Sequence, residues 1–305
     1  MSGTENIQTV AISGPNGLVG SALTPLLEAE GKQVFGISRS AGGSYQDSIR
    51  WDPESGLTNP GRLESVDAIV HLAGESIAAG RWNSRLKHRI RHSRVEGTKN
   101  LVKSIAAVEK RPKVLVCASA IGIYGNRGVA ELDETSDPGP GFLADVCKDW
   151  EAEANAATEL GVRVVNVRIG VVLSPKGGAL AKMLLPFRLC LGGIVGPGTQ
   201  YWSWIGLKDL TRIIAYCINN ESISGPVNAV SPTPSTNRDF TKVLGKVLRR
   251  PTIFPLPAFV ARIVLGEMAD ALLLSSARVL PSKLESSGFQ FEFPALDDCL
   301  RHELE

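Results

Sequence analysis

The sequence predicts an α/β protein whose core is a doubly wound parallel sheet, followed by a smaller C-terminal α+β lobe. Three observations carry this prediction. Short β-branched runs are continuously apolar, amphipathic stretches separate them over about the first 175 residues, and Gly- and Pro-rich sequence follows at 174–206. Continuous apolar strands joined by helices are typical of a parallel sheet covered on both faces. We place the sheet domain at 1–175, completed by part of 205–230, and the lobe at 176–305.

The expected elements of the sheet domain alternate in chain order. Strands are predicted at Thr9–Ser13, Gln33–Arg39, Val66–Leu72, Lys113–Ala118 and Val162–Val172. Helices are predicted at Ser21–Glu30, Arg85–Val108 and Leu143–Leu160. Gly31 and Gly161 stand where helix C-caps commonly carry glycine.

The lobe has a different rhythm. We expect helices at Phe240–Leu248, Ala258–Leu265 and Glu267–Leu274, strands at Arg249–Pro257 and Phe289–Phe293, and a final helix at the C-terminus.

Composition excludes several classes of protein. The chain has 305 residues, with 33 Lys and Arg against 31 Asp and Glu, so it is not built as a general nucleic-acid or anionic-membrane binder, although a local basic patch stays open. Five scattered cysteines without C-x-x-C argue against disulfide frameworks and metal sites. Neither a secretory signal nor an apolar run of about 18 residues occurs. We expect a cytoplasmic protein without nucleic-acid or membrane partners.

The first candidate site is the glycine turn G-P-N-G-L-V-G, which lies directly after the first strand and opens the first helix. Glycine lets the backbone approach a pyrophosphate, and free amides with the helix dipole stabilise its charge. The alternative is a tight turn without a ligand. This context predicts a Rossmann-type dinucleotide-binding domain. The residues expected to contact the pyrophosphate are Gly14, Asn16, Gly17, Leu18, Val19 and Gly20.

The end of the second strand indicates which dinucleotide binds. A carboxylate there would bind the ribose hydroxyls of NAD, whereas this chain has Ser38 and Arg39. Arginine can pair with a 2′-phosphate, so we predict NADP, against the alternative of a plain surface arginine.

Small residues also follow the third strand, where a cofactor can lie against the backbone. They are Leu72, Ala73 and Gly74. Trp51 and Asp52 either flank the adenine or form a local packing anchor.

With these motifs in order, the chain resembles the extended short-chain dehydrogenase/reductase superfamily. H-L-A-G at 71–74, V-E-G-T-K-N-L at 95–101 and S-A-I-G-I-Y-G at 119–125 carry the resemblance. Longer strings at 142–151 and 236–240 are similar to the atypical nucleoside-diphosphate-sugar epimerase-like branch, which has a C-terminal domain of unknown function. The resemblance covers nearly the whole chain. It implies a Rossmann domain, a C-terminal substrate lobe, NADP as cofactor and, by analogy, a homodimer.

The resemblance also indicates what the site lacks. Such enzymes use a Ser or Thr, a Tyr and a Lys for proton transfer. Here Lys148 matches the lysine, but Ala144 and Ala120 replace the tyrosine and serine. We expect Lys148 to contact the cofactor ribose, the alternative being an exposed helical lysine. Tyr124 and Ser119 are the candidates for the missing groups, against a packed loop tyrosine and a hydroxyl bonded to backbone.

The basic segment Arg81–Arg94 carries six Arg or Lys residues and two His. It is a solvated helix face, a phosphate or substrate-anion contact, or a nucleic-acid patch. The superfamily often has Asn where this chain has Arg94, so we assign Arg94 to the cofactor, with Arg89 as a second candidate.

Three further residues are assigned to the substrate. Glu75 follows the cofactor segment directly, and Trp202 and Trp204 stand in an aromatic cluster. A solvated loop carboxylate and packing between the two parts are the respective alternatives.

Two functions follow. The first is an NADP-binding oxidoreductase or epimerase-like enzyme that acts on a small hydroxylated or carbonyl substrate without the usual Tyr and Ser. The second is a non-catalytic NADP-sensing or scaffold protein.

Overall fold

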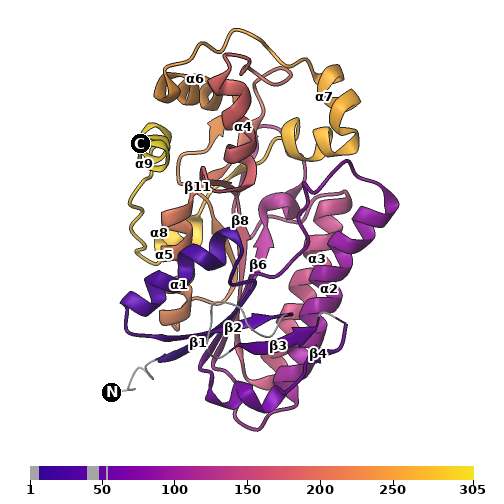
Figure 1. The fold of residues 1–305 in the computed structure, drawn as a ribbon, viewed down its shortest axis with the longest axis vertical. Coiled ribbons are helices and arrows are strands. Elements are labelled where there is room, and N and C mark those ends of the chain that lie inside the picture. Colours follow the sequence, from indigo (N-terminus) through magenta and orange to yellow (C-terminus); the bar gives the residue numbers. More distant parts are fainter. Residues whose placement is uncertain (1–6, 40–47, 53) are drawn as a thin grey trace.

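The structure is a computed structural model that describes residues 7–39, 48–52 and 54–305. Its centre is an eight-stranded sheet with the order β12-β8-β6-β5-β1-β2-β3-β4 (Figure 1). The strands are β1 (Thr9–Ser13), β2 (Gln33–Ser38), β3 (Ile49–Asp52), β4 (Gly56–Leu57), β5 (Ala68–His71), β6 (Val114–Ala120), β8 (Arg163–Ile169) and β12 (Gly225–Ala229). Each neighbouring pair is parallel except β3 with β4.

Helices cover both faces of this sheet (Figure 1). One face packs against α1 (Leu18–Ala29) and α5 (Leu207–Asn219), and the other packs against α2 (Ser84–Ala106) and α3 (Phe142–Asn155). Helix α3 continues into a 3-10 turn, Ala156–Leu160. Alternate β1 residues enter the two cores, as the two-residue period of a strand requires: Val10 and Ile12 face one core and Ala11 the other. The prediction of a doubly wound parallel sheet is confirmed.

The order of the strands places a functional site. Strand β1 lies between β2 and β5, so the chain leaves β1 in one direction and returns on its other side. Ligands of open α/β sheets bind outside the carboxyl ends of the strands at such a reversal. The glycine turn after β1 and the segment after β5 both lie there.

The C-terminal part has its own core and smaller sheets. Its helices are α4 (Gly178–Arg188), α6 (Asn237–Leu248), α7 (Ala258–Leu265), α8 (Ser282–Ser286) and α9 (Leu296–Leu304). Its strands form three two-stranded sheets: β10 (Tyr201–Trp202) with β13 (Ser235–Thr236), β11 (Trp204–Gly206) with β9 (Val171–Leu173), and β14 (Arg278–Val279) with β7 (Glu131–Leu132). Strands β7 and β9 come from the first 175 residues. This arrangement agrees with the expected smaller α+β region.

Three element predictions were wrong. The strand Val162–Val172 is two strands separated at Gly170, where an added Cβ would lie 2.7 Å from the Ser203 carbonyl oxygen. The chain leaves the large sheet at that close approach. Arg249–Pro257 forms only an isolated bridge through Leu256, because its prolines cannot donate ladder hydrogen bonds. Phe289–Phe293 is irregular, and its aromatic rings pack against neighbouring elements instead.

One further element is present with a different winding. The helix predicted at Glu267–Leu274 runs over 267–273, and its residues Ala269–Leu273 are wound as a π-helix. The final helix is present as α9.

Candidate functional site

The glycine turn is built for close backbone packing. Gly14 has φ +72°, and its carbonyl accepts the Gly17 N–H at 3.0 Å. An added Cβ at Gly20 would lie 2.4 Å from the Gly14 carbonyl oxygen, which no real contact allows. The turn therefore requires glycine at Gly14 and Gly20, and it aims the start of α1 at the carboxyl end of the sheet.

The start of α1 is open to an anion. Gly17 is the N-cap, so no side chain caps the first amides, and among the described residues no acidic side chain lies in the first turn. Asn16 and Gly17 are exposed, whereas Leu18 and Val19 are half-buried. Unsatisfied amides and the positive end of the helix dipole together favour a phosphate group. The turn therefore fits the pyrophosphate of a dinucleotide.

Ser13 joins this turn to the segment after β5. Its Oγ accepts the amides of Leu72 at 3.0 Å and Ala73 at 3.2 Å, and it lies 2.7 Å from Nδ1 of His71. Because Oγ already accepts two amides, its O–H donates to His71, which then carries its own proton on Nε2. Burial lowers the pKa of His71 to about 4. An added Cβ at Gly14 would meet Ala73 at 3.3 Å, so the two cofactor segments lie against each other.

At the carboxyl ends of β2 and β3, one side chain is buried in the core and others are exposed. Trp51 is buried, with its ring edge-on to His71 at 5.8 Å, so the packing-anchor alternative is confirmed for it. Asp52 accepts the backbone amide of Glu54, the main cause of its lowered pKa, and the charge of Arg39 adds to that effect. Arg39 is exposed at the carboxyl end of β2, where it can reach a phosphate, and Ser38 is half-buried before it.

Arg94 holds a fixed charge beside the cofactor segment. Its Nη1 donates to the carbonyls of Glu75 at 2.9 Å and Ile90 at 3.2 Å, and its guanidinium lies over the Trp150 ring. An added Cβ at Gly74 would lie 3.3 Å from its Cζ. In the described part of the chain no carboxylate lies within ion-pair distance of it, and burial lowers its pKa. Such a guanidinium is suited to an anion supplied by a ligand.

The other cations of the basic segment mostly pair within the protein. Lys87 binds Glu267 at 2.5 Å, Arg91 binds Asp149, and Arg89 lies 3.5 Å from Glu75. These pairs engage the segment with α3 and with the C-terminal part, so it is more than a solvated helix face. The half-buried Glu75 also donates its amide to Ser93.

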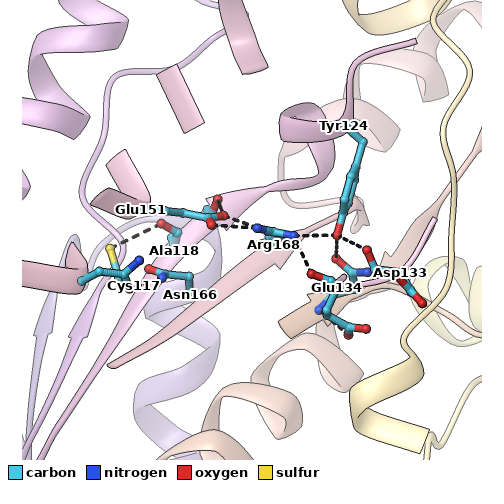
Figure 2. Close-up of polar contacts among 11 residues, drawn as sticks. Cys117, Ala118, Tyr124, Asp133, Glu134, Glu151, Asn166 and Arg168 are labelled. Atoms are coloured by element: carbon cyan, nitrogen blue, oxygen red, sulfur yellow. Dashed lines mark hydrogen bonds and ion pairs between the residues drawn. The ribbon is translucent and has the colours of Figure 1, made fainter. Parts of the chain in front are cut away.

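A buried polar network lies at the carboxyl ends of β6 and β8 (Figure 2). Ser119 donates to Oε1 of Glu151 at 2.6 Å. Arg168 donates from Nε and Nη2 to the two oxygens of Glu151, both at 2.9 Å, and from Nη1 to the hydroxyl of Tyr124 at 2.8 Å. Burial opposes the charge of Arg168, yet its hydrogen bonds to Glu151 and the charge of that carboxylate together raise its pKa.

This network corrects the assignment of Tyr124. Its side chain is fully buried, and its hydroxyl contacts Arg168, the Asp133 carbonyl at 2.9 Å and Oδ1 of Asn228 at 2.8 Å. Burial also raises the pKa of Tyr124. It is a packed network residue with no face for a substrate, because the surrounding chain already uses every direction of its hydroxyl. The hydroxyl of Ser119 is likewise taken by a carboxylate rather than by backbone.

Both tryptophans assigned to the substrate belong to the third core. Trp202 and Trp204 are buried, and their Nε1–H groups donate to the carbonyls of Leu273 at 3.2 Å and Thr233 at 3.1 Å. The structure contradicts the substrate-wall prediction for this pair, because the ring nitrogens are satisfied and the side chains are only 7% and 0% exposed. The packing alternative is confirmed.

Lys148 lies outside the network. Its side chain is 43% exposed and pairs with Asp145, one turn earlier on α3, at 2.6 Å. These contacts agree with the alternative that Lys148 is an exposed helical lysine. Its contact with a cofactor ribose stays a prediction.

Sequence reasoning missed the members that hold the network together. Glu151, Arg168, Asn228 and Glu134 are buried, and Glu134 accepts the Asn228 amide at 3.0 Å. A signal did exist: polar Asn166 and Arg168 alternate with the apolar residues Val165, Val167 and Ile169 in the second half of a predicted strand. A buried charge needs a partner, so this alternation implied an acid on the neighbouring helix.

Family models match most of the chain. The model described as NAD dependent epimerase/dehydratase family matches residues 10–229, and the model described as Domain of unknown function (DUF1731) matches residues 256–303. The second match fits the C-terminal domain of unknown function that the resemblance implied.

Individual relatives are similar over nearly the whole of this chain. Epimerase family protein Mb2239 of Mycobacterium bovis is 43% identical over 95% of this chain and 96% of its own. The crystal structure of human epimerase family protein SDR39U1 (isoform 2) with NADPH has a TM-score of 0.88 and 36% identity, over 97% of this chain and 99% of that one. A nucleoside-diphosphate sugar epimerase from Corynebacterium glutamicum has a TM-score of 0.80 and 36% identity, over 98% of this chain and 58% of that one.

Proposed function

The chain belongs to the NAD-dependent epimerase/dehydratase family, and on that premise we propose that it is an NADP-dependent oxidoreductase or epimerase-like enzyme. Its substrate is a small hydroxylated or carbonyl compound. The similarity to the NADPH-bound structure of human SDR39U1 supports NADP as the cofactor. The family's usual Tyr and Ser are absent, so the enzyme is atypical.

The observation that carries this proposal is the pairing of an uncapped helix start with an exposed arginine one strand away. The amides after Gly17 bind the pyrophosphate, and Arg39 binds the 2′-phosphate. Leu72, Ala73 and Gly74 line the backbone strip beside that turn. A bound nicotinamide supplies hydride transfer.

Arg94 contributes a fixed positive charge to this site. Two carbonyls fix one edge of its guanidinium, and the Trp150 ring supports its face. A preorganised cation of this kind stabilises a cofactor phosphate or a negative oxygen on the substrate without reorganisation. It can replace part of the electrostatic work that the missing tyrosine does, although it is no ready proton donor.

The second candidate function is a non-catalytic NADP-sensing or scaffold protein. One observation favours it: Ala144 is buried at the tyrosine position, and the nearby Tyr124 and Ser119 are both engaged in the network. A protein of this kind binds the cofactor tightly and turns nothing over.

Cofactor choice is tested with Arg39→Ala. We expect the wild-type protein to prefer NADPH over NADH, and the variant to lose NADPH affinity roughly ten- to hundredfold while NADH affinity stays the same. Titration calorimetry measures the four dissociation constants. Arg111→Ala is the matched control, because Arg111 is an exposed arginine before β6, at the opposite end of the strands. Equal affinities for the two cofactors in the wild-type protein would remove Arg39 from the site.

Catalysis is tested separately. NADPH oxidation is followed against a panel of aldehydes, ketones and nucleotide sugars, with Arg94→Met as the variant. Turnover that Arg94→Met abolishes supports the enzyme. Tight NADPH binding without turnover on any of these substrates favours the sensing protein.

A further inference from the structure

An exposed apolar surface covers one end of the molecule. Of the nine exposed large apolar side chains in the described residues, eight lie between 185 and 191 or between 253 and 264. We call this surface the apical patch, and its members are Leu185, Leu189, Leu191, Ile253, Phe254, Phe259, Ile263 and Val264. Most of them are exposed by 60% or more. Clusters of this kind mark interaction surfaces, whereas single exposed apolar residues do not.

The two segments form one surface. The Leu256 amide donates to the Ile194 carbonyl at 2.8 Å, and the Gly196 amide donates to the Leu256 carbonyl at 2.9 Å. An added Cβ at Gly193 would overlap the Phe254 carbonyl. In Figure 1 the end of α4, the connection from α6 to α7, and α7 lie together at one end of the long axis. The patch is therefore continuous and lies at a protruding end.

The chain around the patch is cationic. Residues 176–208 contain four Lys or Arg and no Asp or Glu, and residues 240–266 contain five Lys or Arg and no Asp or Glu. Three of these nine cations, Lys208, Lys246 and Arg262, pair with the carboxylates of Glu292, Asp297 and Asp270. Arg188, Arg249 and Arg250 are exposed beside the patch. In the described part of the chain none of these three has a carboxylate partner, and Arg250 donates only to the carbonyls of Arg188 and Arg249. The near-neutral composition of the whole chain conceals this local charge.

The positive charge beside the apical patch distinguishes among the ligands that the patch could bind. A second copy in a two-fold dimer would bring two sets of the same arginines together, which like charges oppose. A protein partner is less favoured by composition, because the patch contains only Leu, Ile, Val and Phe, whereas binding hot spots are enriched in Trp and Tyr. Apolar side chains on a protruding end with a cationic rim match a lipid surface that carries negative headgroups.

We propose that the apical patch binds the surface of an anionic lipid bilayer. Phe259 and Ile263, one turn apart on α7, enter the boundary between headgroups and acyl chains together with Phe254. Arg249 and Arg250 bind lipid phosphates. In the described part of the chain no helix is long and apolar enough to cross a bilayer, so the protein lies on the surface. The composition argument against a membrane partner holds for the chain average and not for this end.

Vesicle sedimentation tests the proposal. Vesicles of phosphatidylcholine and phosphatidylserine in equal parts are compared with vesicles of phosphatidylcholine alone. We expect the wild-type protein to sediment with the anionic vesicles and to be released by salt. Arg188→Gln/Arg249→Gln/Arg250→Gln should weaken that binding roughly 100-fold or more. Phe259→Ser/Ile263→Ser should abolish it at the same lipid concentration.

Matched controls separate the patch from general effects. Val129→Ser removes an equally exposed apolar side chain outside the patch and should bind vesicles as the wild-type protein does. All variants should keep the wild-type melting temperature and NADPH affinity, since the substituted side chains are exposed and distant in sequence from the glycine turn. Light scattering reports the oligomeric state of each.

Three outcomes would overturn the proposal. In the first, the wild-type protein does not sediment with the anionic vesicles. In the second, the patch variants bind these vesicles as well as Val129→Ser does. In the third, the vesicles are not bound and Phe259→Ser/Ile263→Ser converts a dimer to a monomer. The last result would assign the patch to a second copy of the chain.

Discussion

His71 helps to hold the segment after β5 beside the glycine turn, through its hydrogen bond with Ser13. It is fully buried, its Nδ1 accepts from Ser13, and its Nε2 has no hydrogen-bond partner in the described structure. A charged imidazole has no counter-ion there, so burial keeps the folded pKa near 4, against an ordinary value of 6.5. The neutral ring and Ser13 together fix the start of the segment after β5.

This histidine gives a pH dependence with a definite sign. Below pH 6.5 the unfolded chain binds a proton at His71 that the folded chain does not bind until the pH approaches 4. Its contribution to stability is therefore complete above pH 6.5 and is lost as the pH falls toward 4, by at most about 3 kcal/mol. Urea unfolding between these pH values should show the loss. His71→Gln should flatten that part of the profile, and an unchanged slope would refute the assignment.

Arg168 and Glu151 are the second case at this scale. Both side chains are about 90% buried, and two hydrogen bonds join them. Arg168→Met leaves a buried carboxylate without its cation, so we expect a loss of about 3–5 kcal/mol in unfolding free energy. Arg168→Met/Glu151→Leu should recover part of that loss, since neither charge then remains buried. Urea denaturation of each variant measures the differences.

A surface pair serves as the control for this loss. Arg91 and Asp149 form an ion pair with side chains that are nearly half exposed. Arg91→Ala should cost less than about 1 kcal/mol. If Arg168→Met costs no more than Arg91→Ala, the network does not hold these elements together.

At the scale of elements, the predicted and observed structures agree where neighbouring residues alone determine the type and bounds of a helix or strand. Strands β1, β2, β5 and β6 and helices α2 and α3 begin and end within a few residues of their predicted bounds, because their apolar runs and caps are local signals. The glycine turn was predictable for the same reason: its spacing, its preceding strand and its following helix are all read from neighbouring residues.

Tertiary contacts decide the remaining elements. Gly170 ends β8 because Ser203 and Val230, distant in sequence, approach its backbone. Helix α4 formed within sequence rich in Gly and Pro, since Leu180 and Leu184 bury a face in the third core. Tyr124 and Trp204 read as site residues from motif position alone, whereas their burial depends on partners from other segments. Local pattern carries no information on such partners.

Gly20 tests whether the turn geometry determines cofactor binding. Its added Cβ would meet three backbone atoms of Gly14 and Pro15 at 2.4–2.9 Å, and backbone cannot move aside as a flexible side chain can. We expect Gly20→Ala to displace the turn and to weaken NADPH binding at least about tenfold, with a smaller effect on stability. Titration calorimetry and thermal unfolding measure the two effects.

Gly61→Ala is the control for Gly20→Ala. Gly61 has room for a methyl group, with its nearest neighbour at 3.4 Å, and it lies before β5, away from the turn. This variant should bind NADPH as the wild-type protein does. Equal affinities for Gly20→Ala and Gly61→Ala would show that the cofactor does not depend on the turn.

At the scale of the whole molecule, the C-terminal segment ties the parts together. Val279 pairs beside β7 and donates its amide to Ser203, and the Leu280 carbonyl accepts from Asn228 at the end of β12. Leu284 then enters the core beneath the large sheet, while Leu300 enters the third core. One segment thus contributes buried side chains to both parts, and separating the parts would expose both cores.

This arrangement predicts that the chain unfolds as one cooperative unit. The slowest-exchanging amides of β1 and of α6 should report the same opening free energy in hydrogen exchange, since neither part keeps its core without the other. NADPH at 100 times its dissociation constant should raise both free energies by about 2.7 kcal/mol, because ligand bound to one cooperative unit stabilises all of it. Exchange measured by mass spectrometry with and without NADPH gives both values. An increase confined to β1, with α6 unchanged, would show that the C-terminal segment does not couple the lobe to the cofactor site.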